Sequence, residues 1–274
     1  MALQHETIKP EIGSRVLSPK EDLLSGEYAK EVRDLLEERG VLVFPKIDFD
    51  DDEQIAFTKT LGTLYPEHNG EELHKITLDP VKTPSADYLK GSMYWHLDGT
   101  MNDKPIFASL LSGKVLSDVG GETHFSNTYA AYENLSDEDK AKYEEMCVMH
   151  GAWASLYYYD PEPNPQMLNA MMNIGDARLP LVWKHRSGRK SLVLGCTAYE
   201  VEGAGIKESR KILTELLAWS TQEAFVYEHK WSVGDMVIWD NTGTLHRATP
   251  YDPRSGRCMH RTKLEGEEAF SLAN

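Results

Sequence analysis

The stretch YWHLDGT, residues 94–100, places a histidine and an aspartate two positions apart in apolar, aromatic surroundings. Such a run predicts a buried strand over residues 92–98, where His96 and Asp98 would lose water and need partners. Side chains at i and i+2 of a strand point to the same side. Two such ligands plus a second histidine make the two-histidine-one-carboxylate triad of non-haem Fe(II) oxygenases. The spacing therefore predicts a metal site that needs one more ligand.

His246 is the best candidate for that ligand. The chain has 10 histidines, so the choice rests on context. His246 lies in WDNTGTLHRAT, residues 239–249, where it follows a strand and a turn and enters a new apolar segment. Because it lies far along the chain from His96, their pairing would be a contact across a barrel.

Two arginines follow in GRCMHRTKL, residues 256–264. Arg257 and Arg261 are spaced by four, which places both on one face of a strand, while His260 points away. Arginine stays charged when buried, so both guanidinium groups need anionic partners. Two separate organic acids would satisfy them.

The remaining sequence must supply the elements that position these residues. Amphipathic periodicity predicts helices over residues 27–40 and 48–62, with a buried strand over 41–45 between them. Helical patches are expected at 127–149 and 206–221, and a loop or lid at the proline-containing segment 157–173. Glycine turns separate short strands, predicted over residues 92–98, 107–116, 121–126, 190–195, 225–232, 235–240, 244–249 and 257–264. We expect a β-sandwich or barrel with helices outside, in one domain over residues 1–274.

The composition excludes some classes of function. The formal net charge of -15 argues against surfaces for nucleic acid or anionic membranes, but not against a small anionic substrate. Cys147, Cys196 and Cys258 are scattered and form no CxxC pair, which fits a reducing cytoplasm. No apolar run approaches the ~20 residues of a membrane span. We expect a cytoplasmic protein.

The motifs, in this order, resemble a known family. WHLDGT, GGETHFSNTYAAYENL, WDNTGTLHRATPYD and GRCMHRTKL are similar to the taurine and 2,4-dichlorophenoxyacetate dioxygenases (TauD/TfdA-like) over roughly residues 40–264. The resemblance implies a mainly β fold with flanking helices and a double-stranded β-helix (jelly-roll or cupin-like) core. It also implies an enzyme, dependent on Fe(II), 2-oxoglutarate and O2, that oxidises and above all hydroxylates a substrate C–H bond and releases succinate and CO2.

The resemblance also implies roles for single residues. His96, Asp98 and His246 look like the catalytic iron ligands. Thr123 resembles the hydroxyl that bonds the distal carboxylate of 2-oxoglutarate, and Arg257 the arginine that pairs with it bidentately. Arg261 resembles the residue that grips an anionic group of the substrate.

The substrate is expected to be a small anion such as a sulfonate, an aryloxyalkanoate or another carboxylic acid. Tyr94 and the segment YPEHNGEELHKITL, residues 65–78, are expected to contact it. Further candidates lie after residue 150. For Lys75 and Lys90, the alternative to substrate binding is that they are surface charges. The candidates are Tyr65, His68, His74, Lys75, Lys90, Tyr94, Trp153 and Tyr157 to Tyr159.

Two other functions stay open at this point. One is a biosynthetic tailoring oxidase that hydroxylates, desaturates or decarboxylates an amino-acid-like intermediate. The other, of a different class, is a non-catalytic barrel that binds a metal or a small ligand. Members of the family often associate, so we also consider a homo-oligomer.

Overall fold

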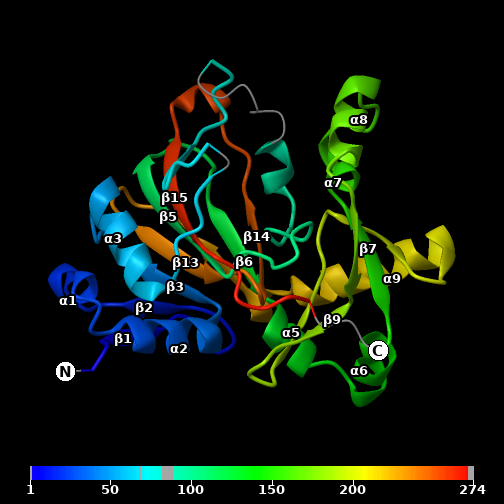
Figure 1. Cartoon of the computed structure of the whole chain (residues 1–274), viewed down its shortest axis with the longest axis horizontal. Helices are drawn as coiled ribbons and strands as arrows, with labels where there is room; N and C mark the ends of the chain where they lie inside the picture. Colours follow the sequence, from blue (N-terminus) through cyan, green and yellow to red (C-terminus); the bar gives the residue numbers. More distant parts are fainter. Residues whose placement is uncertain (1, 68, 82–88, 271–274) are drawn as a thin grey trace.

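The computed structural model (Figure 1) describes residues 2–67, 69–81 and 89–270. The helices are α1 Lys20–Leu24, α2 Ala29–Arg39, α3 Asp51–Leu61, α5 Thr128–Glu133, α6 Asp137–Glu144, α7 Ala152–Tyr159, α8 Pro165–Met172 and α9 Gly205–Ser220, with 3-10 turns η1 Lys90–Met93, η2 Glu223–Phe225 and η3 Pro253–Ser255. The strands are β1 His5–Thr7, β2 Ser14–Val16, β3 Val41–Phe44, β4 His74–Ile76, β5 Ala108–Val115, β6 Thr123–Asn127, β7 Cys147–Gly151, β8 Asp176–Pro180, β9 Val182–Lys184, β10 Lys190–Leu192, β11 Ala198–Val201, β12 Val226–His229, β13 Met236–Asp240, β14 Thr244–Ala248 and β15 Cys258–Leu264.

Within the described residues, the largest sheet has seven strands in the order β1-β2-β3-β13-β5-β15-β4. We call it the large sheet. A second sheet consists of β12, β6 and β14 in that order. Smaller sheets pair β11-β7-β8 and β10-β9. Except for the parallel pair β2 and β3, the strand pairs of the large sheet are antiparallel.

The central strands of the large sheet are buried on both faces. In β3, Leu42 and Phe44 pack into the core shared with α2 and α3, whereas Val41 and Val43 pack on the other side. That second face forms a separate core with Phe125 of β6, in the second sheet. A strand covered on both faces reads as a continuous apolar run, which is why VLVF was predicted as a buried strand. The two sheets therefore pack face to face, with helices covering the outer face of the large sheet (Figure 1).

Several predicted elements are confirmed. The helices expected at 27–40, 48–62 and 206–221 are α2, α3 and α9, and the strand at 41–45 is β3. The acidic start of α3 is a capping box, because the Asp50 side chain accepts from the Glu53 backbone and the Glu53 side chain accepts from the Asp50 backbone. The strands expected within 107–126 and 225–264 are β5, β6 and β12 to β15.

The prediction of a strand over residues 92–98 is wrong. Residues 90–93 form η1, and the extended segment that follows makes only an isolated bridge at His96 among the described residues. A tight turn stops the pairing directly after Asp98. Gly99 occupies it at φ +83°, and a Cβ there would lie 3.0 Å from the Ile106 backbone nitrogen.

The loop predicted over residues 157–173 is wrong, since this segment is largely helical. It contains the end of α7 and the whole of α8, which project together away from the large sheet (Figure 1). The Asn164 side chain accepts from the Met167 backbone, and Pro165 occupies the first turn of α8, so the helix has a regular start. The helical patch expected at 127–149 divides into α5 and α6, because Ser136 caps a new helix, and its last residues belong to the strand β7. The fold is thus a mixture of helices and sheets, and no helix among the described residues is long and apolar enough to cross a membrane.

Candidate functional site

His96 and His246 lie directly opposite each other in the fold. They form an antiparallel bridge in which the His96 N–H donates to the His246 carbonyl at 3.1 Å and the His246 N–H donates back at 2.9 Å. His246 belongs to β14, which pairs with β6 in the second sheet. The contact predicted between these distant segments is therefore a backbone pairing, and it brings the two imidazole centroids to 4.1 Å.

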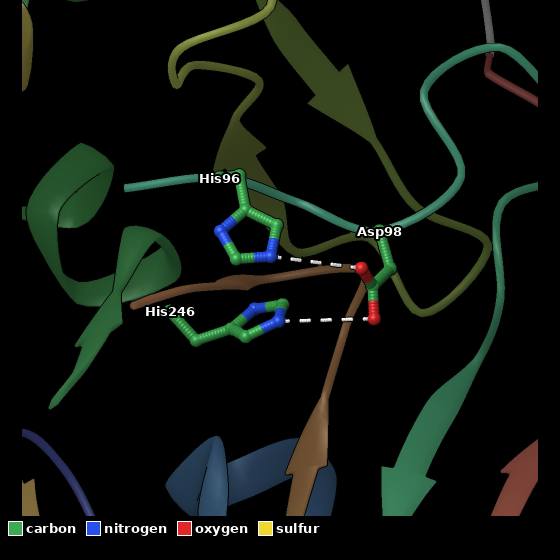
Figure 2. A group of neighbouring side chains, drawn as sticks. All are labelled: His96, Asp98 and His246. Atoms are coloured by element: carbon green, nitrogen blue, oxygen red, sulfur yellow. Dashed lines mark ion pairs between the residues drawn. The ribbon is translucent and has the colours of Figure 1, made fainter. Parts of the chain in front are cut away.

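Both imidazoles point toward the Asp98 carboxylate (Figure 2). His96 Nε2 lies 3.7 Å from Asp98 Oδ1, and His246 Nε2 lies 3.7 Å from Asp98 Oδ2. One ligand atom from each residue lies within 4.8 Å of the others. The separation is too long for hydrogen bonds and suits three atoms arranged around one ion. The three side chains fit the two-histidine-one-carboxylate facial triad.

The surroundings of the remaining side-chain atoms of His96 and Asp98 also suit a metal site. His96 Nδ1 lies 2.8 Å from the Tyr94 carbonyl, so this nitrogen carries the proton and Nε2 keeps its lone pair for a ligand role. Asp98 Oδ2 is buried and has no hydrogen-bond partner among the described residues. A buried, unpaired carboxylate oxygen is costly unless a cation occupies the space beside it.

The electrostatics hold these groups in forms that bind a metal. Burial lowers the pKa of His246 to about 3, and His96 adds to the effect, so the imidazole is neutral near pH 7. Burial raises the pKa of Asp98, but His246 and Arg261 outweigh it and bring the pKa to about 2. A neutral imidazole and an ionised carboxylate are the ligand forms that divalent metals require.

Asn241 fixes the backbone of Asp98. Its Oδ1 accepts from the Asp98 N–H at 3.1 Å, and its Nδ2 donates to the carbonyls of Asp98 at 2.8 Å and Ile106 at 3.1 Å. Asn241 is fully buried. The preceding residue, Asp240, accepts from Thr242 and Tyr129 and so holds the turn that leads into His246. The WDN turn thus positions two of the three candidate ligands.

A small cavity of about 90 Å³ lies beside the triad and includes His96 and His246 in its wall. Thr123 and Arg257 also line it, and both are nearly fully buried. Arg257 Nη2 donates to the Gly121 carbonyl at 2.8 Å. Gly121 is required there, because a Cβ would lie 2.7 Å from Arg257 Nε. We call this space the small cavity.

The Thr123 hydroxyl has a fixed partner outside the small cavity. Trp231 Nε1 donates to Thr123 Oγ1 at 3.0 Å. A hydroxyl can donate one proton and can also accept hydrogen bonds, and the indole N–H of Trp231 bonds to the hydroxyl oxygen as an acceptor. Thr123 therefore keeps its proton for an acceptor inside the small cavity.

A second, larger cavity of about 450 Å³ also borders the triad. His96, Asp98 and Arg261 line it, together with Tyr65 and Lys263. Arg261 Nη1 lies 3.7 Å from Asp98 Oδ2. The apolar part of its wall comes from Leu89, Leu97, Met101, Ile106, Ala152 and Ile174. We call this space the large cavity.

The sequence of this chain matches the family model "Taurine catabolism dioxygenase TauD, TfdA family" over residues 4–263. The chain belongs to the TauD/TfdA family. It is 32% identical over 263 residues to the alpha-ketoglutarate-dependent 2,4-dichlorophenoxyacetate dioxygenase of Burkholderia sp. (strain RASC), which covers 89% of this chain and 87% of that protein. It is also 32% identical, over 86% of this chain and 85% of the relative, to the (S)-phenoxypropionate/alpha-ketoglutarate-dioxygenase of Sphingobium herbicidovorans.

A solved structure, AAD-2 in complex with Mn(II) and N-oxalylglycine, has the same fold. The TM-score is 0.84 at 30% identity, and the match covers 99% of this chain and 100% of that chain. The protein is therefore an oxidoreductase of the TauD/TfdA family that depends on alpha-ketoglutarate (2-oxoglutarate). This confirms the predicted class of enzyme and removes support from the non-catalytic barrel.

In this TauD/TfdA dioxygenase, two residues expected to contact the substrate lie outside the described walls of the two cavities. Lys75 lies in β4 and faces Asp51 at 3.9 Å, whereas its neighbour Ile76 lines the small cavity, so alternation along the strand turns Lys75 away. The Tyr94 ring packs on Tyr158 at 5.2 Å and lines neither cavity. Tyr94 contributes its carbonyl to His96 instead.

Other candidates fall outside the walls of the two cavities. His68 lies outside the described residues. Trp153 donates to Asp176 at the surface. His74, Lys90 and Tyr157 to Tyr159 also do not line either cavity, although Ala152 and Ser155 of α7 border the large one. Tyr65 and Arg261 line the large cavity.

The paired arginines are placed as predicted. Arg257 and Arg261 both line the small cavity, while His260 Nδ1 lies 2.6 Å from Asp51 on the opposite face of β15. Sequence analysis missed Asn241, Trp231 and Lys263 as residues of the site. Lys263 had a signal, because it continues the alternation of Arg257 and Arg261 along one strand face.

Proposed function

We propose that this TauD/TfdA dioxygenase binds Fe(II) through His96, Asp98 and His246. With 2-oxoglutarate and O2 it hydroxylates a C–H bond of a small organic acid and releases succinate and CO2. The observation that carries this proposal is the grouping of the three side chains in the walls of the two cavities, with His96 in both, His246 in the small cavity and Asp98 in the large one. When bound, the metal supplies the redox chemistry, and the protein supplies placement and exclusion of water.

The small cavity is the proposed site of 2-oxoglutarate. Arg257 presents its guanidinium group to the distal carboxylate, and Thr123 donates its hydroxyl proton to the same group. Thr123 pairs with Ala248, two residues beyond His246, and Arg257 contacts Gly121, so an acid that reaches these two residues has its other end toward His96 and His246. The cation of Arg257 is buried beside the Tyr251 ring, at 4.6 Å, and gains an anionic partner when the cosubstrate binds.

The large cavity is the proposed site of the substrate. Arg261 binds the anionic head, and the apolar wall holds the remainder of the molecule. The relatives named above act on aryloxyalkanoates, and a further relative is the alpha-ketoglutarate-dependent sulfate ester dioxygenase of Pseudomonas putida, 25% identical. These names support an aryloxyalkanoate first and a sulfonate or sulfate ester second.

We further propose that the two packed sheets form a double-stranded β-helix within one domain, because residues from both sheets build one site. The free cysteines, with Cys147 and Cys196 buried, support a cytoplasmic location. The absence of nucleic-acid partners and the homo-oligomer remain predictions.

The test is an anaerobic titration of metal-free protein with Fe(II) and then 2-oxoglutarate. We expect the visible charge-transfer band of a chelated 2-oxoglutarate in the wild type, and a far higher 2-oxoglutarate requirement in Arg257→Ala. Binding of Fe(II) without any such band, or an Arg257→Ala titration that matches the wild type, would contradict the proposed cosubstrate site. Succinate release with a panel of acids then identifies the substrate.

A further inference from the structure

Lys263 is a second cation in the wall of the large cavity. It lies in β15 two residues beyond Arg261, and alternation places Arg257, Met259, Arg261 and Lys263 on one face of the strand. The first three line the small cavity, and the last two line the large cavity. Lys263 is only 6% exposed, so its stem and its ammonium group are held in place by the surrounding protein.

A single carboxylate already lies between these two cations. Glu67 Oε1 is 2.7 Å from Lys263 Nζ and 3.6 Å from Arg261 Nη2. Because both cations contact the same oxygen, their nitrogen atoms lie within about 6 Å of each other, which one carboxylate can span with its two oxygens. Glu67 is not among the described residues that line the large cavity.

The charges of the wall do not balance. Asp98 is the only acidic side chain among the described residues that line the large cavity, and the proposed function assigns it to the metal. Arg261 and Lys263 then face the cavity with Glu67 as their shared partner, which leaves one positive charge in excess. Arg261 Nε is buried and has no hydrogen-bond partner among the described residues. One monoanionic group on the cavity side would compensate the excess charge.

We propose that Lys263 determines substrate specificity, by forming with Arg261 a two-cation subsite, preorganised by Glu67, for the carboxylate or sulfonate head of the substrate. This inference rests on the proposed function and names a residue of that same site. Tyr65 completes the subsite, since the Lys263 ammonium lies 5.2 Å from its ring centroid and the Tyr65 N–H donates to the Lys263 carbonyl at 2.8 Å. The chain segment before β4 is thereby fixed to β15 at the head-group end of the large cavity.

The alternative is that Lys263 and Glu67 are a buried ion pair that stabilises the fold alone. The two roles differ in their dependence on substrate charge. A cation that binds the head distinguishes an acid from its neutral amide, whereas a purely structural pair affects both ligands equally. The comparison therefore needs matched probes of the same shape.

The experiment measures binding of phenoxyacetate and of 2-phenoxyacetamide to protein loaded with Mn(II) and N-oxalylglycine, by calorimetry. In Lys263→Met we expect the Kd of the acid to rise about 10- to 100-fold, as for loss of a charge-assisted hydrogen bond, and that of the amide to change less than about twofold. Lys263→Arg should keep most of the affinity for the acid. Lys75→Met, an exposed lysine of β4, is the matched control and should bind both probes as the wild type does.

A second variant serves as the control for a folding defect in Lys263→Met. Lys263→Met leaves Glu67 without its closest cation, whereas Glu67→Gln with Lys263→Met removes both charges and leaves no such buried carboxylate. The double variant should show the same loss of preference for the acid. Equal losses for acid and amide, or unchanged binding of the acid in either variant, would overturn the role of Lys263.

The proposed function fails in a different way. If the wild type loaded with Fe(II) consumes no 2-oxoglutarate with any acid of the panel, the dioxygenase assignment of the site is wrong. If the wild type does consume 2-oxoglutarate with an acid, and Lys263→Met keeps the wild-type KM for that acid, only the inference about Lys263 is wrong. Where an acid other than phenoxyacetate is turned over faster, that acid and its amide replace the first pair of probes.

Discussion

Removal of the Asn241 side chain is expected to weaken metal binding although Asn241 is not itself a candidate ligand. Asn241→Ala deletes three hydrogen bonds, two to the Asp98 backbone and one to the Ile106 carbonyl. At about 1 kcal/mol for each bond, the free energy of unfolding falls by about 3 kcal/mol, and the Tm by about 6 to 12 °C. The released Asp98 carboxylate should cost about 10- to 100-fold in metal affinity, as is usual for residues that orient ligands.

The assay is Mn(II) titration of the metal-free protein by calorimetry, alongside the Tm without metal. Asn134→Ala is the control, because Asn134 Nδ2 also makes a hydrogen bond, to the Ala130 carbonyl at 2.9 Å, but far from the triad in sequence and at the end of α5. We expect this variant to lose stability and keep its Mn(II) affinity. Wild-type affinity in a folded Asn241→Ala protein would refute the idea that the WDN turn positions Asp98.

Three further outcomes are expected. Trp231→Phe removes the donor to Thr123, so the KM for 2-oxoglutarate should rise about fivefold while the Mn(II) affinity stays unchanged, and a Thr123→Ala background should abolish the difference. Burial raises the pKa of Asp240 to about 6, so its ionised form destabilises the fold as the pH rises through 6. Asp240→Asn should therefore be stabilised relative to the wild type at pH 8, on the order of 3 kcal/mol, and lose this advantage at pH 4; an equal difference at both pH values would contradict the assignment. Mn(II) at about 100 times its Kd should stabilise the wild type by about 2.7 kcal/mol, and a similar increase in Tm in Asp98→Ala would exclude Asp98 as a ligand.

Strand periodicity is what made much of this site predictable. Side chains that alternate along a strand can be assigned to one face from sequence alone, and this placed Arg257 and Arg261 together and His260 apart. The same rule relates His96 to Asp98, although the segment that carries them pairs only at His96. Local spacing was enough to place both side chains on one side, because side chains alternate along any extended backbone, whether or not it belongs to a long strand.

Contacts between distant segments were not predictable in this way. Glu67 reaches Lys263 from a loop, and Trp231 reaches Thr123 from the segment after β12. No local pattern in either segment indicates its partner, since the sheet order that brings them together is a property of the whole fold. The start of α8 is different, because the asparagine and proline at 164 and 165 are a helix-start signal that was read as a loop.

The strand β15 determines how far apart the proposed cosubstrate and substrate heads lie. Arg257 borders the strand at one end, and Arg261 and Lys263 lie further along the same face. Four residues of extended chain span about 13 Å, which sets the backbone spacing between Arg257 and Arg261. β5 holds β15 in a regular register from Met259 to Leu264, and the register shifts between Cys258 and Met259. A substitution at Cys258 or His260, which line neither cavity, preserves both subsites, whereas one inserted residue would turn either Arg257 or the pair Arg261 and Lys263 out of the site.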